Sequence, residues 1–298
     1  MMLSRGDFLQ TGAVAAVGTA AAGDVAQTSG GGGKLKMRWF GGGVYELSTL
    51  DDSVIVLVDA WIWNNGGWKI FGLPIPPELQ SAQAYAAHLF RRDPEAVLVA
   101  LTHDHGDHMG DYFELLPALV SAGLPVLTVG QSDLMRVGLV PKFKAANLDE
   151  TTIVANKGAG MNFGGVMTHK SIRAHLVPAV HSTALGYPPA GFIFDIAGTI
   201  VYASGDTDLW GDMSDLGRRY RPQIGVFCVG NGAFTMGPED AAHAVKAFGV
   251  AHAVPVHYAH NALVLGTQAG EMFKSAVARI SPQTTVSVLR PGESIVLS

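Results

Sequence analysis

Three histidines and two aspartates lie within six residues of the chain, directly after an apolar run that predicts a strand. His103 and His105 are two residues apart, so an extended backbone places both rings on the same side. Asp107 and His108 follow a glycine, where the chain can turn and direct them to a second centre. Imidazole and carboxylate are ligands that divalent cations prefer in proteins. The spacing therefore predicts that this segment contributes to a site for one or two metal ions.

The other candidate ligands each follow a separate predicted strand, and they are His181, Asp206 and His257. Strand ends in layered proteins carry the loops in which binding and catalytic residues gather. The chain has one cysteine, Cys228, which excludes a cysteine-rich zinc site and an intrachain disulfide. Any metal must then be held by histidine and carboxylate side chains.

Several neighbouring residues are candidates for supporting or substrate-binding roles. Asp59 ends a predicted strand, where it either orients a ligand histidine or the turn of the 103–108 segment, or only caps a turn. Thr207 and Asp208 follow Asp206 and are expected to brace it. Substrate contacts are expected from three residues of later loops: Asn231, Tyr258 and His260. For His260 the alternatives are a further metal ligand, a proton donor or an ordinary loop histidine.

Three of the five tryptophans lie within eight residues: Trp61, Trp63 and Trp68. They belong to a predicted loop, Trp61–Phe71, that follows Asp59. We expect this loop to form an apolar flap over the metals and to bind an apolar or aromatic substrate. Core packing and a subunit interface in a homo-oligomer are the alternatives.

Charge and hydropathy narrow the functional class. With 298 residues and 48% apolar residues, the chain can bury a large core. The net charge of −5 is the wrong sign for binding nucleic acid through its phosphates. The sequence also lacks a run of about 18 apolar residues that could span a membrane. These properties favour an enzyme that acts on a small molecule.

The first 33 residues differ in composition from the rest. A single basic residue, Arg5, precedes an apolar stretch rich in alanine, and a run of glycines follows it. This order is typical of an export signal. The segment around Arg5 resembles a twin-arginine signal in which Gly6 takes the place of the second arginine. We therefore expect residues 1–33 to be an export segment of a periplasmic protein, with a tail on a cytoplasmic protein as the alternative, and residues 34–298 to form the folded functional domain.

Strands and helices alternate over residues 34–298. The predicted strands are Leu35–Phe40, Val44–Leu47, Ser53–Asp59, Ala96–Thr102, Val126–Val129, Ile172–Val180, Gly191–Phe194, Thr199–Ala203, Ile224–Val229, His252–Val256, Thr285–Leu289 and Ser294–Leu297. The predicted helices are Leu79–Arg92, Tyr112–Ala122, Asp133–Val137, Pro238–Phe248 and Gln268–Ile280. The early part is rich in strands and helices intervene later, which indicates an α/β protein with mixed sheets.

With these motifs in place, the chain resembles metallo-β-lactamase-fold hydrolases over about residues 36–298. The resemblance rests on the spacing of His103, His105, Asp107 and His108 and on the order of the later candidate ligands. Within that superfamily it is most similar to the L-ascorbate-6-phosphate lactonase-like branch. The finer likeness lies in residues 58–61, 179–182, 204–207, 234–241 and 255–258. It ends at Ala259, where that branch usually has Gly-Thr.

This resemblance implies a four-layer αββα sandwich with the site at one edge of the sheets. It assigns His103, His105 and His181 to one metal, Asp107, His108 and His257 to a second, and Asp206 to a bridge between them. The expected ions are one or two Zn²⁺, with Mn²⁺ as the alternative. Asp107, Asp206 and His257 are the expected catalytic residues.

The expected reaction is attack by a metal-bound hydroxide on a lactone, ester, amide or carbon bearing a leaving group such as halide. A phosphoesterase or nuclease on the same fold and a non-catalytic metal-binding protein are the alternatives. A di-iron enzyme of this fold usually carries glutamate where His105 stands, which disfavours redox chemistry.

Overall fold

Alternation along the central strands shows that the sheet in which they lie is buried on both faces. In strand β3 (Val54–Val58), Val54, Val56 and Val58 pack into one apolar cluster, and Ile55 and Leu57 pack into another. Successive side chains of a strand point to opposite faces, so each face must be covered by another layer. The computed structural model describes residues 33–139, 141–142, 160–230, 234–261 and 263–298.

The first sheet has six strands in the order β13-β1-β2-β3-β4-β5. Its other strands are β1 (Leu35–Gly41), β2 (Val44–Thr49), β4 (Ala96–Ala100), β5 (Val126–Val129) and β13 (Ser294–Leu297). Strands β13, β1, β2 and β3 pair antiparallel, whereas β3, β4 and β5 pair parallel. The sheet is therefore mixed, as the sequence indicated.

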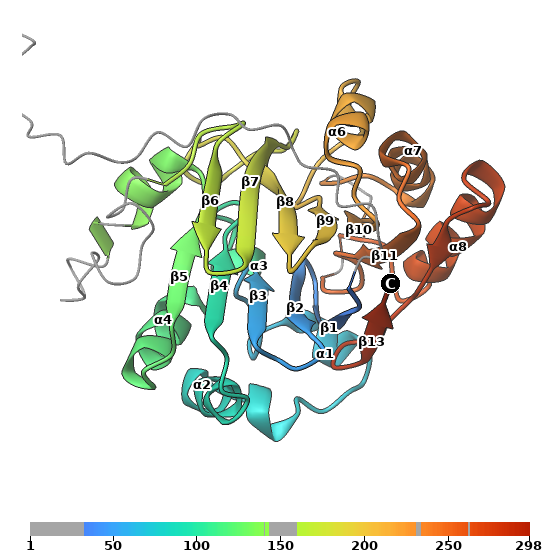
Figure 1. Ribbon diagram of the computed structural model, residues 1–298. Coiled ribbons are helices and arrows are strands. Elements are labelled where there is room, and N and C mark those ends of the chain that lie inside the picture. The colour runs from blue at the N-terminus through green and yellow to red at the C-terminus, as the bar shows by residue number, and fades with distance from the viewer. Residues whose placement is uncertain (1–32, 140, 143–159, 231–233, 262) are drawn as a thin grey trace, which may run out of the picture. The chain divides into compact units, whose positions relative to one another are not determined.

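The second sheet has seven strands in the order β12-β11-β10-β9-β8-β7-β6. Its strands are β6 (Val166–His169), β7 (Ile172–Pro178), β8 (Ala190–Ile196), β9 (Thr199–Ala203), β10 (Ile224–Cys228), β11 (His252–Val256) and β12 (Thr285–Val286). Strands β6 to β9 form an antiparallel meander, and β9 to β12 pair parallel. Both sheets thus combine a hairpin half with a parallel half (Figure 1).

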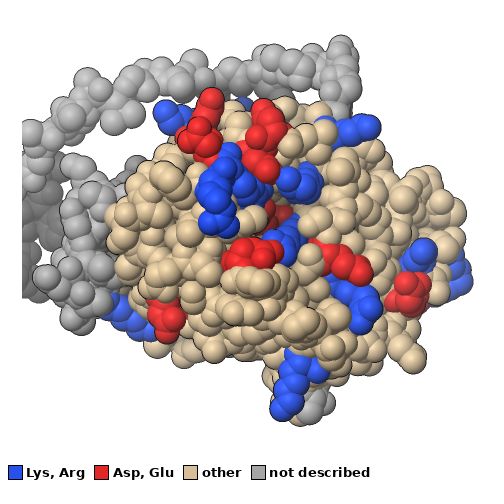
Figure 2. Space-filling view, turned by 90° about the horizontal axis from the view of Figure 1, so that it is seen from below, with Lys and Arg blue, Asp and Glu red and all other residues tan. Residues whose placement is uncertain are grey.

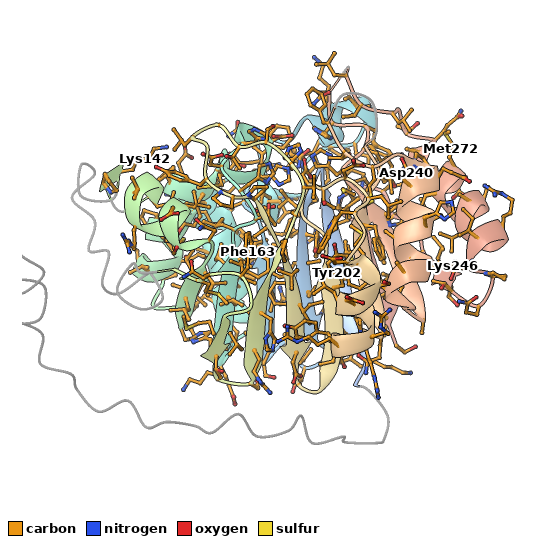
Figure 3. The ribbon with its side chains drawn as sticks, turned by 90° about the horizontal axis from the view of Figure 1, so that it is seen from above. Lys142, Phe163, Tyr202, Asp240, Lys246 and Met272 are labelled. Atoms are coloured by element: carbon orange, nitrogen blue, oxygen red, sulfur yellow. The ribbon has the colours of Figure 1, made fainter. Side chains whose placement is uncertain are left out.

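Helices cover the outer faces of the two sheets. They are α1 (Gly66–Ile70), η1 (Pro77–Leu79), α2 (Ala82–Arg91), α3 (Gly106–Met109), α4 (Tyr112–Ser121), the π-helical η2 (Leu134–Leu139), α6 (Met213–Tyr220), α7 (Pro238–Phe248) and α8 (Ala269–Ile280). Helices α2 and α4 pack on the first sheet, and α7 and α8 pack on the second. On these last two helices Asp240, Lys246 and Met272 point outward (Figure 3). The predicted four-layer αββα sandwich is confirmed.

Several elements differ from the sequence prediction. The predicted helix Leu79–Arg92 is interrupted, because Ser81 caps a new helix by accepting a hydrogen bond from the backbone N–H of Ala84 at 3.2 Å. Strand β12 ends at Val286, three residues earlier than predicted. Strand β6 and helices α1, α3 and α6 were not predicted, since each is short, with eight residues or fewer.

Charged side chains on the face that carries α2 and η1 are interspersed in sign (Figure 2). Lys36 and Arg92 both contact Asp52, and Arg38 contacts Glu78 at 2.7 Å. These three basic groups are therefore paired with carboxylates, which reduces the positive charge they could offer to a phosphate backbone. Within the described residues, no helix has both the length and the hydropathy needed to cross a bilayer.

Candidate metal centre

Strand direction brings the predicted site residues to one edge of the sandwich. Strands β3 and β4 are parallel, so the residues that follow them, Asp59 and His103, leave the first sheet at the same edge. In the second sheet β7 and β9 are both antiparallel to β8, and β9 to β11 are parallel. The chain therefore leaves these strands toward His181, Asp206 and His257 in the same direction. Five separate strand ends converge on one site.

Backbone strain accompanies this convergence. Asp59 and His257 directly follow their strands and adopt φ angles of 60° and 62°, in the left-handed region that favours glycine. A non-glycine residue in this conformation raises the free energy of the folded state, so surrounding contacts must hold it there. Such residues cluster at functional sites. The turn after each strand redirects the side chain, and the backbone N–H of His257 donates to the carbonyl oxygen of Gly42 at 2.7 Å.

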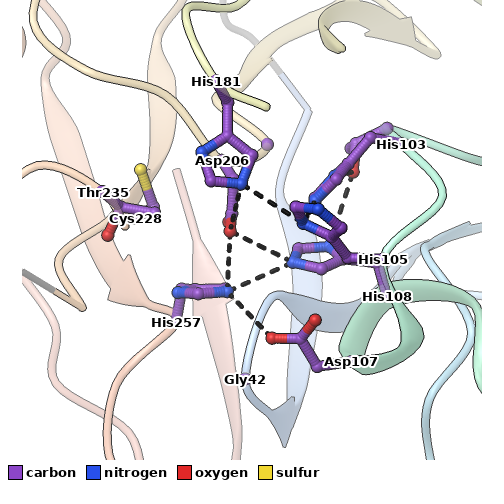
Figure 4. A network of polar contacts seen from close by, with 12 residues as sticks. Gly42, His103, His105, Asp107, His108, His181, Asp206, Cys228, Thr235 and His257 are labelled. Carbon is purple, nitrogen blue, oxygen red and sulfur yellow. Dashed lines mark hydrogen bonds and ion pairs between the residues drawn. The ribbon is translucent and has the colours of Figure 1, made fainter. Parts of the chain in front are cut away.

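Histidine and aspartate side chains form three overlapping groups whose ligand atoms lie within 4.8 Å of one another: His103, His105 and His181; His103, His108 and Asp206; and Asp107, His108 and His257 (Figure 4). The first and third groups have the members that the family resemblance implied for two separate metals. Asp206 lies between them, with Oδ2 at 3.3 Å from His108 Nε2 and 2.9 Å from His257 Nε2.

The way the ring nitrogens face one another fits bound cations. His103 Nε2 lies 2.9 Å from His105 Nδ1, which lies 3.3 Å from His181 Nε2. His108 Nε2 and His257 Nε2 are 3.1 Å apart. A neutral imidazole carries one N–H and one lone pair, so rings whose facing nitrogens are unprotonated can offer their lone pairs to a cation at a shared point. Oδ1 of Asp206 is also buried and has no hydrogen-bond partner among the described residues, as expected of a ligand or bridging oxygen.

Burial and charge act in opposite directions on these groups. Burial opposes ionisation of Asp206, but the neighbouring His257 and His108 outweigh it and hold its pKa well below the usual value. Burial likewise lowers the pKa of His257, but Asp206 and Asp107 overcome this and raise it to about 9. For His103, burial and the charge of His108 both lower the pKa. Cation binding by Asp107, His108 and His257 therefore competes with protons.

Asp59 fixes the orientation of one candidate ligand. Oδ2 of Asp59 lies 2.7 Å from His108 Nδ1 and accepts a hydrogen bond from the Thr102 hydroxyl at 2.7 Å. Oδ1 accepts a hydrogen bond from the backbone N–H of Thr102 at 2.8 Å. A carboxylate on Nδ1 leaves Nε2 directed at the cluster, which is a common arrangement around metal-binding histidines. The structure thus places Asp59 between the candidate ligand and the strand that carries His103.

Thr207 and Asp208 support the loop of His181 rather than Asp206 itself. The Thr207 hydroxyl accepts from the backbone N–H of Val180 at 2.9 Å, and the N–H of Asp208 donates to the Val180 carbonyl oxygen. Asp104 points away from the cluster and accepts two backbone hydrogen bonds from residues 184 and 185. These contacts join the three loops that carry residues 103–108, His181 and Asp206.

A pocket of about 370 Å³ opens beside the cluster. Beyond the candidate ligands it is lined by Gly106, Ser182, Phe234, His260 and Asn261. A groove of about 570 Å³ between α2 and α4 is larger, but it contains no histidine and lies on the helical face. We assign the functional site to the smaller pocket because it holds the convergent ligands.

The predicted substrate-binding residues occupy different environments. His260 lines the pocket, whereas Asn231 lies outside the described residues. For Tyr258 the prediction is corrected: it is fully buried, and its hydroxyl donates to the Leu289 carbonyl oxygen at 3.0 Å. Trp68 is also corrected, because it is 3% exposed within the core under the first sheet and its indole N–H donates to the Ile62 carbonyl oxygen.

Trp61 and Trp63 are partly exposed and pack against the same core cluster as Trp68. Neither is among the residues that line the pocket. Trp61 approaches the site only indirectly, since its ring meets that of His260 edge to face at 6.1 Å. The aromatic loop therefore lies behind the pocket wall, which agrees with the core-packing alternative for most of its apolar surface.

Sequence reasoning missed two residues that shape this region. Asp111 is buried and binds the backbone of the aromatic loop. The sequence feature that could have indicated Asp111 is its spacing, because it lies four residues after Asp107 and so on the same side of a helical turn. Phe234 supplies the pocket's large apolar side chain and is 41% exposed. It lies in a loop with no ligand, so spacing alone did not distinguish it.

Comparison with known proteins is consistent with this geometry. Residues 56–258 match the family described as Beta-lactamase superfamily domain. A "UPF0173 metal-dependent hydrolase" from Caldivirga maquilingensis is 30% identical over 86% of this chain and 96% of its own length. Another from Thermodesulfovibrio yellowstonii is 29% identical over 88% and 92%.

Solved structures show the same fold. Igni18 from Ignicoccus hospitalis, described as a novel metallo hydrolase, has a TM-score of 0.66 at 24% identity and covers 89% of this chain and 99% of its own. YhfI from Bacillus subtilis, a metallo-beta-lactamase fold protein, has a TM-score of 0.61 at 15% identity and covers 89% and 100%. Each of these likenesses extends over 89% of this chain.

Proposed function

We propose that this protein hydrolyses a small, uncharged, apolar or aromatic substrate. The chain belongs to the beta-lactamase superfamily of metal-dependent hydrolases, and the proposal starts from that membership. The reacting group is a carbonyl, as in a lactone, ester or amide, or a carbon that bears a leaving group such as halide. The site comprises His103, His105, His181, Asp107, His108, His257 and Asp206.

The composition of the pocket wall carries the substrate class. Beyond the cluster the wall offers Phe234 and the neutral polar side chains of Ser182 and Asn261, and none of its lining residues is lysine or arginine. Enzymes that bind phosphate groups usually provide such cations in addition to metals. Two exposed leucines, Leu185 and Leu263, lie in the loops that carry Ser182 and Asn261. The wall therefore favours an apolar substrate over a phosphoester.

The residues divide the chemistry between them. Cations held by the cluster would acidify water and stabilise the negative charge that develops on the substrate. Asp206 and Asp107 offset the positive charge of the ions, and Asp59 keeps His108 oriented toward the cluster. A donor set of imidazoles and two carboxylates suits Zn²⁺, and Mn²⁺ is the alternative ion.

Paired phenylalanine variants test the substrate class. Phe234 and Phe163 are each 41% exposed, but Phe163 is not among the residues that line the pocket. We expect Phe234→Ala to raise KM for an aromatic ester or lactone by about 10-fold or more, the effect of about 1–3 kcal/mol of lost apolar contact. Phe163→Ala should leave the kinetics unchanged. Equal effects of the two variants would contradict the assignment of the pocket.

A substrate panel on metal-quantified protein separates the alternatives. It should contain lactones, esters, amides, haloaromatics and phosphoesters. Preferred turnover of phosphoesters would favour the phosphoesterase alternative. Full metal loading without turnover of any substrate would favour a non-catalytic metal-binding protein.

A further inference from the structure

We propose that His260 is a positioning residue that holds the Asp107 carboxylate in place, and that the aromatic loop, residues 61–71, supports His260. This inference rests on the proposed function, since Asp107 is one of the candidate metal ligands. It gives the tryptophan-rich segment a role that neither substrate contact nor core packing alone provides.

The contact between His260 and Asp107 has a defined polarity. His260 Nε2 lies 3.1 Å from Asp107 Oδ2, and the histidine side chain is 1% exposed. His257 Nε2 is more distant from the same oxygen, at 3.6 Å. An ionised carboxylate can only accept, so Nε2 of His260 carries the proton and donates it in this hydrogen bond. His260 consequently orients Asp107 while its Nε2 is not available as a ligand.

The aromatic loop is fixed by a buried carboxylate. Oδ2 of Asp111 accepts backbone hydrogen bonds from Ile62, Trp63 and Asn64 at 2.5, 2.9 and 3.3 Å. Its Oδ1 accepts from the Asn64 side-chain amide at 2.5 Å. Three consecutive amides on one carboxylate form a strong anchor, because each hydrogen bond is charge-assisted and the group is buried. The loop is thus tied to the start of α4, one helical turn beyond Asp107.

The anchored loop packs against His260. The Trp61 ring meets the His260 ring edge to face, with planes at 85°. Gly66 lies so close to the His260 carbonyl oxygen that a β-carbon at this position would overlap it. Nδ1 of His260 is buried without a hydrogen-bond partner among the described residues. Packing against the loop, rather than a second hydrogen bond, therefore sets the ring's orientation.

The test titrates the metal-free full-length protein with Zn²⁺ and compares three variants. His260→Leu removes the donor and keeps similar bulk. His260→Gln retains an N–H donor near the position of Nε2. Trp61→Leu leaves His260 in place but removes its support. His252→Leu is the matched control, because His252 is 9% exposed and its side chain hydrogen-bonds to Ser287, at the opposite end of β11.

We expect His260→Leu to weaken binding of one of two Zn²⁺ ions by about 10–100-fold, as loss of a ligand's supporting partner usually does. Binding of the other ion should be unchanged. His260→Gln should recover most of the affinity, and Trp61→Leu should show a smaller loss at the same ion. The His252→Leu control should bind both ions like the wild type.

Equal weakening of both ions in His260→Leu, or no recovery in His260→Gln, would indicate a merely structural role and overturn the inference. Should His260→Leu fail to fold, unchanged Zn²⁺ binding by both His260→Gln and Trp61→Leu supports the donor but overturns the role of the loop. A wild-type protein that binds no Zn²⁺ overturns the proposed function as well, so the two failures are distinguishable.

Discussion

The segment 103–111 and the aromatic loop, residues 61–71, are both dense in functional residue types, yet they contribute to the site in opposite ways. In the first, His103, His105, Asp107 and His108 all turn toward one cluster. In the second, Trp68 is buried in the core and the backbone N–H groups donate hydrogen bonds to Asp111. The first segment supplies ligand atoms, and the second supplies a rigid support behind them.

This contrast separates what spacing predicts from what composition predicts. Alternate positions on an extended chain share a side, so the spacing of His103 and His105 fixes their relation before any tertiary contact forms. Aromatic density carries no such constraint, since the same tryptophans can face a substrate, a partner or a core. The following changes test how far the two segments differ.

Loss of a candidate ligand should have the largest effect. His103→Ala and Asp206→Ala should each reduce the bound metal, as measured by elemental analysis of purified protein. Turnover should fall by more than the about 10–100-fold that is typical when only a supporting partner is lost. His243→Ala, an exposed helical histidine, is the control. Unchanged metal content in both ligand variants would contradict the assignment of the cluster.

Truncation of Trp68 should mainly affect folding. Its side chain is almost fully buried, so Trp68→Ala should lower the free energy of unfolding by about 3–5 kcal/mol. KM of the fraction that remains folded should change little, because Trp68 does not line the pocket. Chemical denaturation and steady-state kinetics measure the two quantities. A raised KM with wild-type stability would instead indicate that Trp68 contacts the substrate.

Most of the architecture could be predicted from apolar periodicity. The buried strands β3, β4 and β10 are continuous apolar runs, and each was located within a few residues. Helix α7 was located because Pro238 and two acidic residues mark its start. Short elements such as α1 and β6 escaped prediction because tertiary contacts, not periodicity, hold them in place.

The support around the site depends on contacts that join distant parts of the sequence. Asp111 binds a loop 47 to 49 residues earlier, and His260 meets Asp107 across 153 residues. No local pattern in the sequence identifies the distant partner in either contact. The left-handed conformations at Asp59 and His257 could likewise not be predicted from the sequence, because neither residue type requires them.

A methyl group added at Gly43 should perturb the site without touching a ligand atom. A β-carbon there would lie 2.5 Å from Cε1 of His108, which is tighter than side chains tolerate. Gly43→Ala should cost about 1–3 kcal/mol of stability through overpacking and weaken metal binding. Gly211→Ala is the control, since no described atom lies within 4 Å of its β-carbon. Thermal melting with and without metal measures both effects, and identical behaviour of the two variants would contradict the close packing.

Removal of the N-terminal segment should have the smallest effect. We propose that residues 1–33 are an export segment that is not needed for turnover; residues 1–32 lie outside the described part of the chain. One contact sets the boundary: the Thr199 hydroxyl donates to the Gly33 carbonyl oxygen at 2.7 Å. A chain that begins at Gly33 should keep wild-type turnover and melting temperature. A chain that begins at Lys34 loses this hydrogen bond and should be less stable by at most about 0.5–1.5 kcal/mol, with unchanged turnover. Reduced turnover in the Gly33 chain would show that the preceding segment takes part in the enzyme, because that chain retains the bond to Thr199 and loses only residues 1–32.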